Sequence, residues 1–139
     1  MNYFQVNVNY DRQTGEDNPG RVKEAYLVVA ETCGEAEKVV LDEIKPFIFG
    51  DCETPKIQKK SYFDFFMDHP DSDIYYEAKV EMITIDGDKE RRNVINILVL
   101  ANNIEGALNT LIHILVNYDY EIIGIKKAGI TDILTIQNN

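Results

Sequence analysis

One stretch of this chain occurs twice, and the repeat limits the folds that the chain can adopt. Residues 26–36 read YLVVAETCGEA, and residues 97–107 read ILVLANNIEGA. Each copy is an apolar run that ends in alanine, followed by two polar residues and the start of a helical pattern. The matched residues Thr32 and Asn103 have side-chain oxygens that can accept backbone N–H groups of a helix's first turn. Each copy predicts a buried strand running into a capped helix, so we interpret the match as an internal duplication.

The residues around these stretches predict the same order of elements in both halves. Alternating apolar and polar residues indicate half-buried strands, and apolar residues at helical spacing indicate helices. In the first half, strands are predicted at residues 3–10, 22–30 and 56–62, with a helix at 33–45 before the third strand. In the second half, strands are predicted at residues 75–82, 94–100 and 121–128, with a helix at 104–116 before the third strand. Turns are predicted at residues 11–20, 50–55 and 86–88. The predicted fold class is α+β: two β-β-α-β units whose helices pack on antiparallel-rich sheet.

The length of the chain favours one fused domain over two independent ones. A chain of 139 residues can form one real core, whereas an isolated domain of half this length is marginal. Residues 68–73 are polar and contain Pro70, which indicates a linker. We therefore expect a single domain made of two repeats, residues 1–67 and 74–139.

Net charge and cysteine content limit the cellular compartments and the classes of partner that we expect for the chain. The formal net charge of −10 disfavours binding to duplex nucleic acid, because such binding depends on neutralising phosphates with Lys and Arg. No apolar run approaches the roughly 20 residues of a membrane helix, and the first residues lack a signal-peptide pattern. Cys33 and Cys52 are the only cysteines, a poor match to a secreted disulfide framework. We expect a cytoplasmic protein with two free thiols and no membrane partner.

Motifs that carry catalytic chemistry are absent from the sequence. There is no phosphate-binding loop, dinucleotide turn, zinc-protease motif or nucleophile elbow. Cys33 lies at the predicted start of a helix, where a thiolate is stabilised, but its counterpart Ile104 has no such chemistry. His69 falls in the predicted linker, and His113 falls on a polar helical stripe, so neither indicates a metal site. We expect no catalytic residues, metal or cofactor, and an enzymatic role is the least favoured of the functions considered.

Two lysine pairs are the candidate binding residues. Lys59 and Lys60 precede an aromatic run, and Lys126 and Lys127 occupy nearly equivalent places in the second half. Lysines could hold phosphates or another anion while neighbouring rings stack on bases, as in single-strand binding. The competing interpretation is that the lysines face solvent and the rings fill the core.

The second half has more apolar residues than one sheet face and one helix face require. Both alternating faces of residues 94–100 are apolar, so both need a cover, and residues 104–116 are apolar beyond one stripe. We expect the second helix to be the more buried, and Ile95, Ile97 and Val99 to belong to an interface with the first half or with another chain. A homodimer is the favoured form.

Three motifs resemble a known family. They are the Tyr-Phe-x-Val-x-Val start at residues 3–8, the Tyr-Leu-Val-x-Ala strand with its capped helix, and the Ile-x-Lys-Lys before the aromatic run. Together they are similar to an uncharacterised family, a domain of unknown function from Bacteroidetes and some of their phages. The resemblance implies a bacterial or phage-associated protein and supplies no catalytic residues. The leading hypothesis is a non-enzymatic protein-interaction or assembly component; the alternative is a small-ligand or single-stranded nucleic-acid binding protein.

Overall fold

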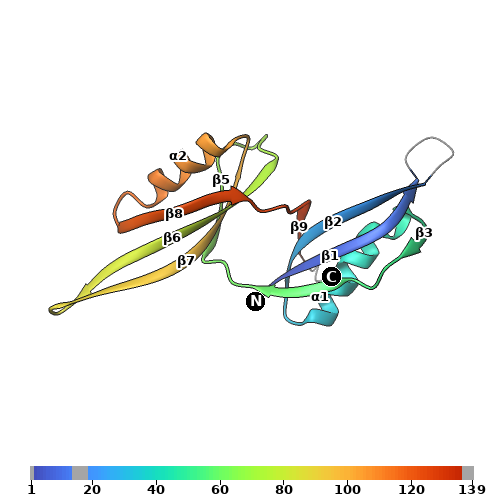
Figure 1. The fold of residues 1–139 in the computed structure, drawn as a ribbon, viewed down its shortest axis with the longest axis horizontal. Coiled ribbons are helices and arrows are strands. Elements are labelled where there is room, and N and C mark those ends of the chain that lie inside the picture. The colour runs from blue at the N-terminus through green and yellow to red at the C-terminus, as the bar shows by residue number, and fades with distance from the viewer. Residues whose placement is uncertain (1, 14–18, 136–139) are drawn as a thin grey trace. The chain divides into compact units, whose positions relative to one another are not determined.

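A computed structural model describes residues 2–13 and 19–135 of the protein (Figure 1). The chain forms two compact units: residues 1–61 with 130–139, and residues 62–129. The chain leaves the first unit after Ser61 and returns to it at Ile130. Among the described residues, no helix combines the length and the apolar character needed to span a membrane.

The first unit is a mixed sheet with one α-helix. Its elements are β1 (Asn2–Gln13), β2 (Pro19–Ala30), α1 (Cys33–Ile44), a 3-10 turn (Lys45–Phe47), β3 (Ile48–Cys52), β4 (Lys56–Lys60) and β9 (Asp132–Thr135). The strand order is β3-β1-β2-β9, and β4 also pairs with β1. All these pairs are antiparallel except β2 with β9, which is parallel.

The second unit follows a related plan. Its elements are β5 (Asp64–Met67), β6 (Ile74–Asp86), β7 (Lys89–Ala101), α2 (Ile104–Ile114) and β8 (Asp119–Lys127). The strand order is β5-β7-β6-β8, with β5 parallel to β7 and the other pairs antiparallel. The hairpin of β6 and β7 turns at Gly87, whose φ of 66° suits the tight turn predicted at residues 86–88. The chain is therefore a mixed α and β protein made mostly of strands.

The compact units do not coincide with the expected repeats at residues 1–67 and 74–139. β5 falls within residues 1–67 but pairs with β7, whereas β9 falls within residues 74–139 but pairs with β2. The expected linker at residues 68–73 lies inside the second unit. There the Asp68 N–H donates to the Leu100 carbonyl at 2.9 Å, and Ser72 is buried.

Both helices begin at the predicted caps. The N–H of Glu35 donates to Thr32 Oγ1 at 3.2 Å, and the N–H of Gly106 donates to Asn103 Oδ1 at 2.7 Å. The Glu35 carboxylate accepts the N–H of Glu31 rather than that of the cap residue, so the capping interaction is displaced by one position.

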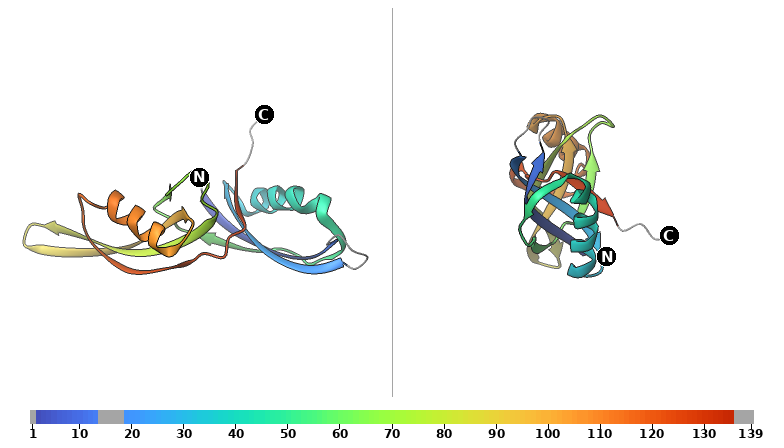
Figure 2. Two further views of the ribbon diagram at one scale, coloured as in Figure 1. Left: turned by 90° about the horizontal axis from the view of Figure 1, so that it is seen from above. Right: turned by 90° about the vertical axis from the view of Figure 1, so that its right-hand side faces the viewer.

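Each helix packs on one face of the sheet of its own unit (Figure 2). The alternation predicted for the first strand is confirmed, since its apolar residues are buried: Phe4, Val6, Val8 and Tyr10. In the second unit Ala78, Val80 and Ile97 are fully buried in the core that includes Ala107 and Leu111 of α2. Leu98 is also buried, although alternation directs it to the opposite face of β7, so both faces of this strand are covered at that point.

Three details differ from the sequence-based expectations. Residues 50–55 were expected as a turn, but β3 extends to Cys52 because it pairs with β1. α2 is not the more buried helix, because its apolar residues extend around the helix beyond the face that meets the sheet and leave Ile104, Leu108 and Ile112 exposed. Residues 11–13 and 19–20 of the expected loop belong to β1 and β2, because these strands pair as far as Gln13 and Pro19; positions 14–18 lie outside the described residues.

The pairing of β9 with β2 predicts that a change near the chain's end destabilises the first unit. Leu134 lies opposite Val28 in the parallel ladder and packs against the first core. Leu134→Asp places an unpaired charge there and should lower the free energy of unfolding by about 2 kcal/mol. Denaturant unfolding measures the loss, and hydrogen exchange should show it in β2. Thr135→Asp, at an exposed position of the same strand, is the control; an equal effect of both variants would contradict the prediction.

Candidate functional site

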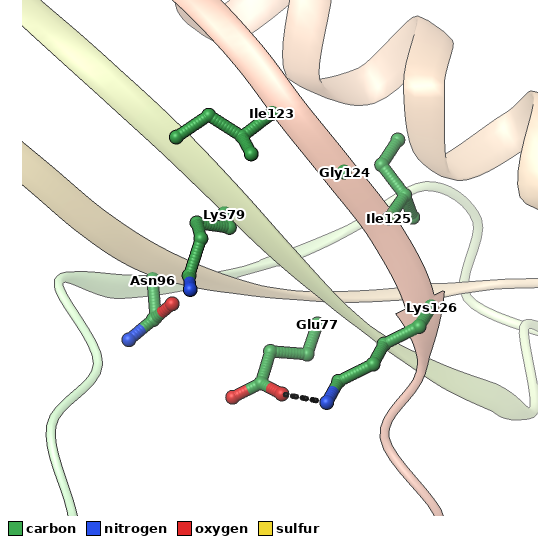
Figure 3. Close-up of a pocket in the computed structure, with 7 residues that line it drawn as sticks. All are labelled: Glu77, Lys79, Asn96, Ile123, Gly124, Ile125 and Lys126. Carbon is green, nitrogen blue, oxygen red and sulfur yellow. Dashed lines mark ion pairs between the residues drawn. The ribbon is translucent and has the colours of Figure 1, made fainter.

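A pocket of about 430 Å³ lies on the sheet of the second unit, on the face opposite α2. Alternation along β6 directs Ala78 and Val80 into the core under α2, so Glu77 and Lys79 lie on the other face. The lining residues come from β6, β7 and β8 and are shown in Figure 3: Glu77, Lys79, Asn96, Ile123, Gly124, Ile125 and Lys126.

The hollow forms where a glycine takes the place of a side chain. Lys79 is paired across the sheet with Asn96 on β7 and with Gly124 on β8. A Cβ atom at Gly124 would meet no heavy atom within 4 Å, so the space beside Lys79 is open. The register of β6 and β8 shifts at this point, and the extra residue Ile123 is 52% exposed at the pocket wall.

Glu77 organises one side of the pocket. Its carboxylate lies 3.7 Å from Lys126 Nζ, and its side chain is only 17% exposed (Figure 3). Burial, followed by the charge of Glu77 and a hydrogen bond to it, raises the pKa of Tyr62 above its ordinary value. Because Lys126 itself is well exposed, the ion pair contributes at most about 1 kcal/mol, but it orients the lysine. Glu77 therefore already has partners within the second unit.

Lys79 and Asn96 are the polar groups of the pocket that remain available. Over residues 2–13 and 19–135, no carboxylate lies within 4.0 Å of the Lys79 ammonium, and the Asn96 side chain makes no hydrogen bond. Lys79 and Lys126 outweigh Glu77 by one positive charge in a chain whose net charge is −10. The arrangement can hold a small anion.

The structure separates the members of each lysine pair predicted from the sequence. Lys59 lies opposite Phe4 and Lys127 opposite Tyr76, on the faces that carry the cores. Lys60 follows Lys59, and Lys126 precedes Lys127. Because successive strand residues point to opposite faces, Lys60 and Lys126 lie on the sheet faces away from the cores. Lys126 lines the pocket, and the other three do not. Sequence reasoning missed Lys79, Asn96 and Gly124, whose proximity depends on cross-strand register.

The other residues considered in the sequence are in ordinary surroundings. Cys33 is exposed at the start of α1, and His113 is exposed near the end of α2, as its polar stripe predicts. His69 Nε2 lies 3.8 Å from the Asp68 carboxylate. Within the part of the chain that the structure describes, no group of three or more His, Cys, Asp and Glu side chains could hold a metal ion.

The residues expected at an interface lie in the core of the second unit. Ile97 and Val99 are fully buried beneath α2, and Ile95 is partly buried against the same cluster.

Comparison with protein families gives a match over residues 2–136 to a domain of unknown function (DUF4494). The chain belongs to this family. Comparisons with curated proteins and with solved structures give no match. The description of the DUF4494 family names no activity. A function for this DUF4494 domain therefore has to be argued from its own surfaces.

The contacts of Glu77 predict the alkaline behaviour of Tyr62. Glu77→Gln removes the negative charge beside the phenol, so the pKa of Tyr62 should fall toward, but not reach, its ordinary value, because burial is the larger cause. A raised tyrosine pKa stabilises the fold below pH of about 10, and this stability is lost as pH rises toward the folded-state value. NMR titration of the Tyr62 ring carbons measures the shift. Glu105→Gln on α2 is the control, and an unchanged Tyr62 titration in Glu77→Gln would contradict the prediction.

Proposed function

We propose that this protein is a non-enzymatic interaction or assembly component that associates with a second copy of itself through α2. The observation that carries the proposal is a row of exposed apolar side chains along and just beyond this helix. They are Ile104, Leu108, Ile112 and Val116, each between 37% and 69% exposed. Residues four apart lie on one side of a helix, so the row forms a continuous strip. Contiguous apolar strips on a protein surface are typical of binding sites.

The corresponding helix of the first unit has no such strip. The positions along and just beyond α1 that match the row are Cys33, Glu37, Leu41 and Lys45. Two of them are charged, and Leu41 packs partly against the first core. The apolar row is thus a particular property of α2 rather than a requirement of a helix on this kind of sheet.

Charge favours α2 as the surface through which two copies would meet. Two copies with a net charge of −10 repel each other, so a contact costs least where each surface is nearly neutral. α2 contains no Lys or Arg, and Glu105 is its only acidic residue. Glu105 and His113 lie near opposite ends of α2, so an antiparallel, twofold contact would bring unlike groups toward each other.

Ile95, Ile97 and Val99, which were expected at an interface, would support the proposed contact without taking part in it. These residues hold α2 from below, because they belong to the cluster that includes Ala107 and Leu111. Their part would be to fix the position of the helix whose outer row makes the contact.

We also propose that the chain arose by internal duplication, with repeats at residues 1–67 and 74–139. Three matched features support this proposal. Thr32 and Asn103 cap their helices in the same way. Asp64 pairs with Ile97 and Asp132 with Tyr26, at positions that match between the repeated stretches. Asp64 and Asp132 each accept the N–H of the following residue at 2.8 Å.

The proposal also includes the biological source and the cellular location of the protein. The resemblance described above supports a bacterial or phage-associated protein. Cys33 and Cys52 are both free thiols, which suits a cytoplasmic location.

The α2 contact can be tested by charge substitution. Leu108→Glu with Ile112→Glu should weaken self-association by about 100-fold or more, because two apolar contacts are replaced by carboxylates. Size-exclusion chromatography with light scattering measures the dimer, and the melting temperature should change little because both positions are exposed. Ile85→Glu, at an exposed position of β6, is the control and should leave the dimer intact. A wild-type protein that stays monomeric at high concentration would refute the proposed contact.

The lysine pairs give the alternative proposal, single-stranded nucleic-acid binding through Lys59, Lys60, Lys126 and Lys127. Lys126 is paired with Glu77, and neighbours in each pair occupy opposite faces, which weakens the case. We therefore expect no tight oligonucleotide binding at physiological salt. Fluorescence anisotropy over a salt series measures it. If binding is found, and if Lys59→Glu with Lys127→Glu abolishes it without unfolding the protein, the alternative replaces the leading proposal.

A further inference from the structure

We propose that the pocket beside Gly124 binds a small monocarboxylate, with Lys79 and Asn96 holding its carboxylate group. This inference deepens the small-ligand alternative and does not depend on the α2 contact. The two residues are direct cross-strand neighbours on β6 and β7 and lie on the same face of the sheet. An ammonium and an amide N–H₂ side by side can each donate to one oxygen of a carboxylate.

The charge of the pocket fits a single negative charge. Lys126 is paired with Glu77, which leaves Lys79 as the unpaired ion. A monoanion would balance Lys79, whereas a phosphate dianion would bring a second charge toward Glu77. The side chain of Glu77 is largely buried, so that repulsion would be poorly screened by solvent.

The walls of the pocket fit a short apolar group attached to the carboxylate. Ile123 exposes apolar surface at the bulge, and Gly124 leaves open space beside it. The volume of about 430 Å³ is near the lower end of ligand sites, which span about 300–1,000 Å³. A straight-chain acid with a few methylene groups has suitable size, and burial of those groups would add to the binding of the carboxylate.

The first unit lacks this combination of residues at the matching places. There the cross-strand pair Gln5 and Gln58 replaces Glu77 and Lys126, and the pair Asn7 and Ala25 replaces Lys79 and Asn96. Lys56 stands opposite Asn7, where the second unit has Gly124 opposite Lys79. The gap and the free ammonium beside it therefore occur together in the second unit and not in the first. Because the first unit has a related sheet and helix without them, the fold itself does not require the gap or the free ammonium.

The test is a titration of the full-length ¹⁵N-labelled protein with acetate, butyrate and hexanoate, followed by NMR chemical shifts. Affinity in the millimolar range is expected for ligands of this size. It should increase with chain length, with shifts at the amides of Lys79, Asn96 and Gly124. A Cβ at Gly124 meets no heavy atom within 4 Å, so we expect Gly124→Val to occupy the pocket and abolish binding while the protein stays folded. Lys79→Gln should weaken binding about tenfold or more.

Lys23→Gln, which removes an exposed lysine from β2 of the first unit, is the matched control and should bind like the wild type. Absence of shifts in the pocket with every acid would overturn the inference. So would undiminished binding by Gly124→Val, an equal loss in Lys79→Gln and Lys23→Gln, or tighter binding of inorganic phosphate than of hexanoate. None of these outcomes bears on the α2 contact, which is measured separately by oligomeric state.

Discussion

The parallel pairing of β9 with β2, and of β5 with β7, is the constraint on which both units depend. β9 reaches β2 from a distant part of the chain, whereas β5 directly precedes the β6–β7 hairpin and pairs with its second strand. Residues 130–135 return to the first unit only after the whole second unit has been traversed. The first sheet is thus completed by a contact of very long sequence separation, and such contacts form at the cost of closing a large loop.

The same arrangement explains how the outer strands β5 and β9 are protected. Each is only four residues long, and each begins with an aspartate that accepts the N–H of the next residue. Short edge strands with charged residues resist pairing with other chains. The sheet edges that these strands form are therefore poor candidates for association. The apolar row of α2 is a separate surface, on a helix, where the proposed contact would need no free strand.

Much of the local structure could be predicted from the sequence, because short-range physics determines it. Thr32 and Asn103 mark the helix starts, and the alternation of Phe4 with Gln5 marks a half-buried strand, since caps and side-chain direction depend on neighbouring residues. The partner of β9 could not be predicted in this way. Residues 132–135 fit an edge strand of either sheet by composition, and only the tertiary structure selects β2.

The same limit applies to the candidate site and to α2. Lys126 was found from its lysine pair, but Lys79, Asn96 and Gly124 are separated in sequence and meet only because of the register and the bulge in β8. For α2, periodicity indicated correctly that the helix is apolar beyond one stripe. It could not indicate whether that excess is covered within the chain, because the width of the covered stripe depends on how the helix lies on its sheet.

The two units share a plan of strands and helix but differ in their surfaces. Residues that hold the scaffold agree in type, as at Val6 and Ala78 in the cores and Thr32 and Asn103 at the caps. Residues that face outward do not: Glu37 corresponds to Leu108. Exposed positions of a stable sheet and helix tolerate substitution at little cost in free energy, so they are free to acquire binding roles. The second unit carries both the apolar helix row and the pocket with its unpaired lysine, on opposite faces of one sheet. A ligand in the pocket and a partner on α2 could therefore be bound at the same time.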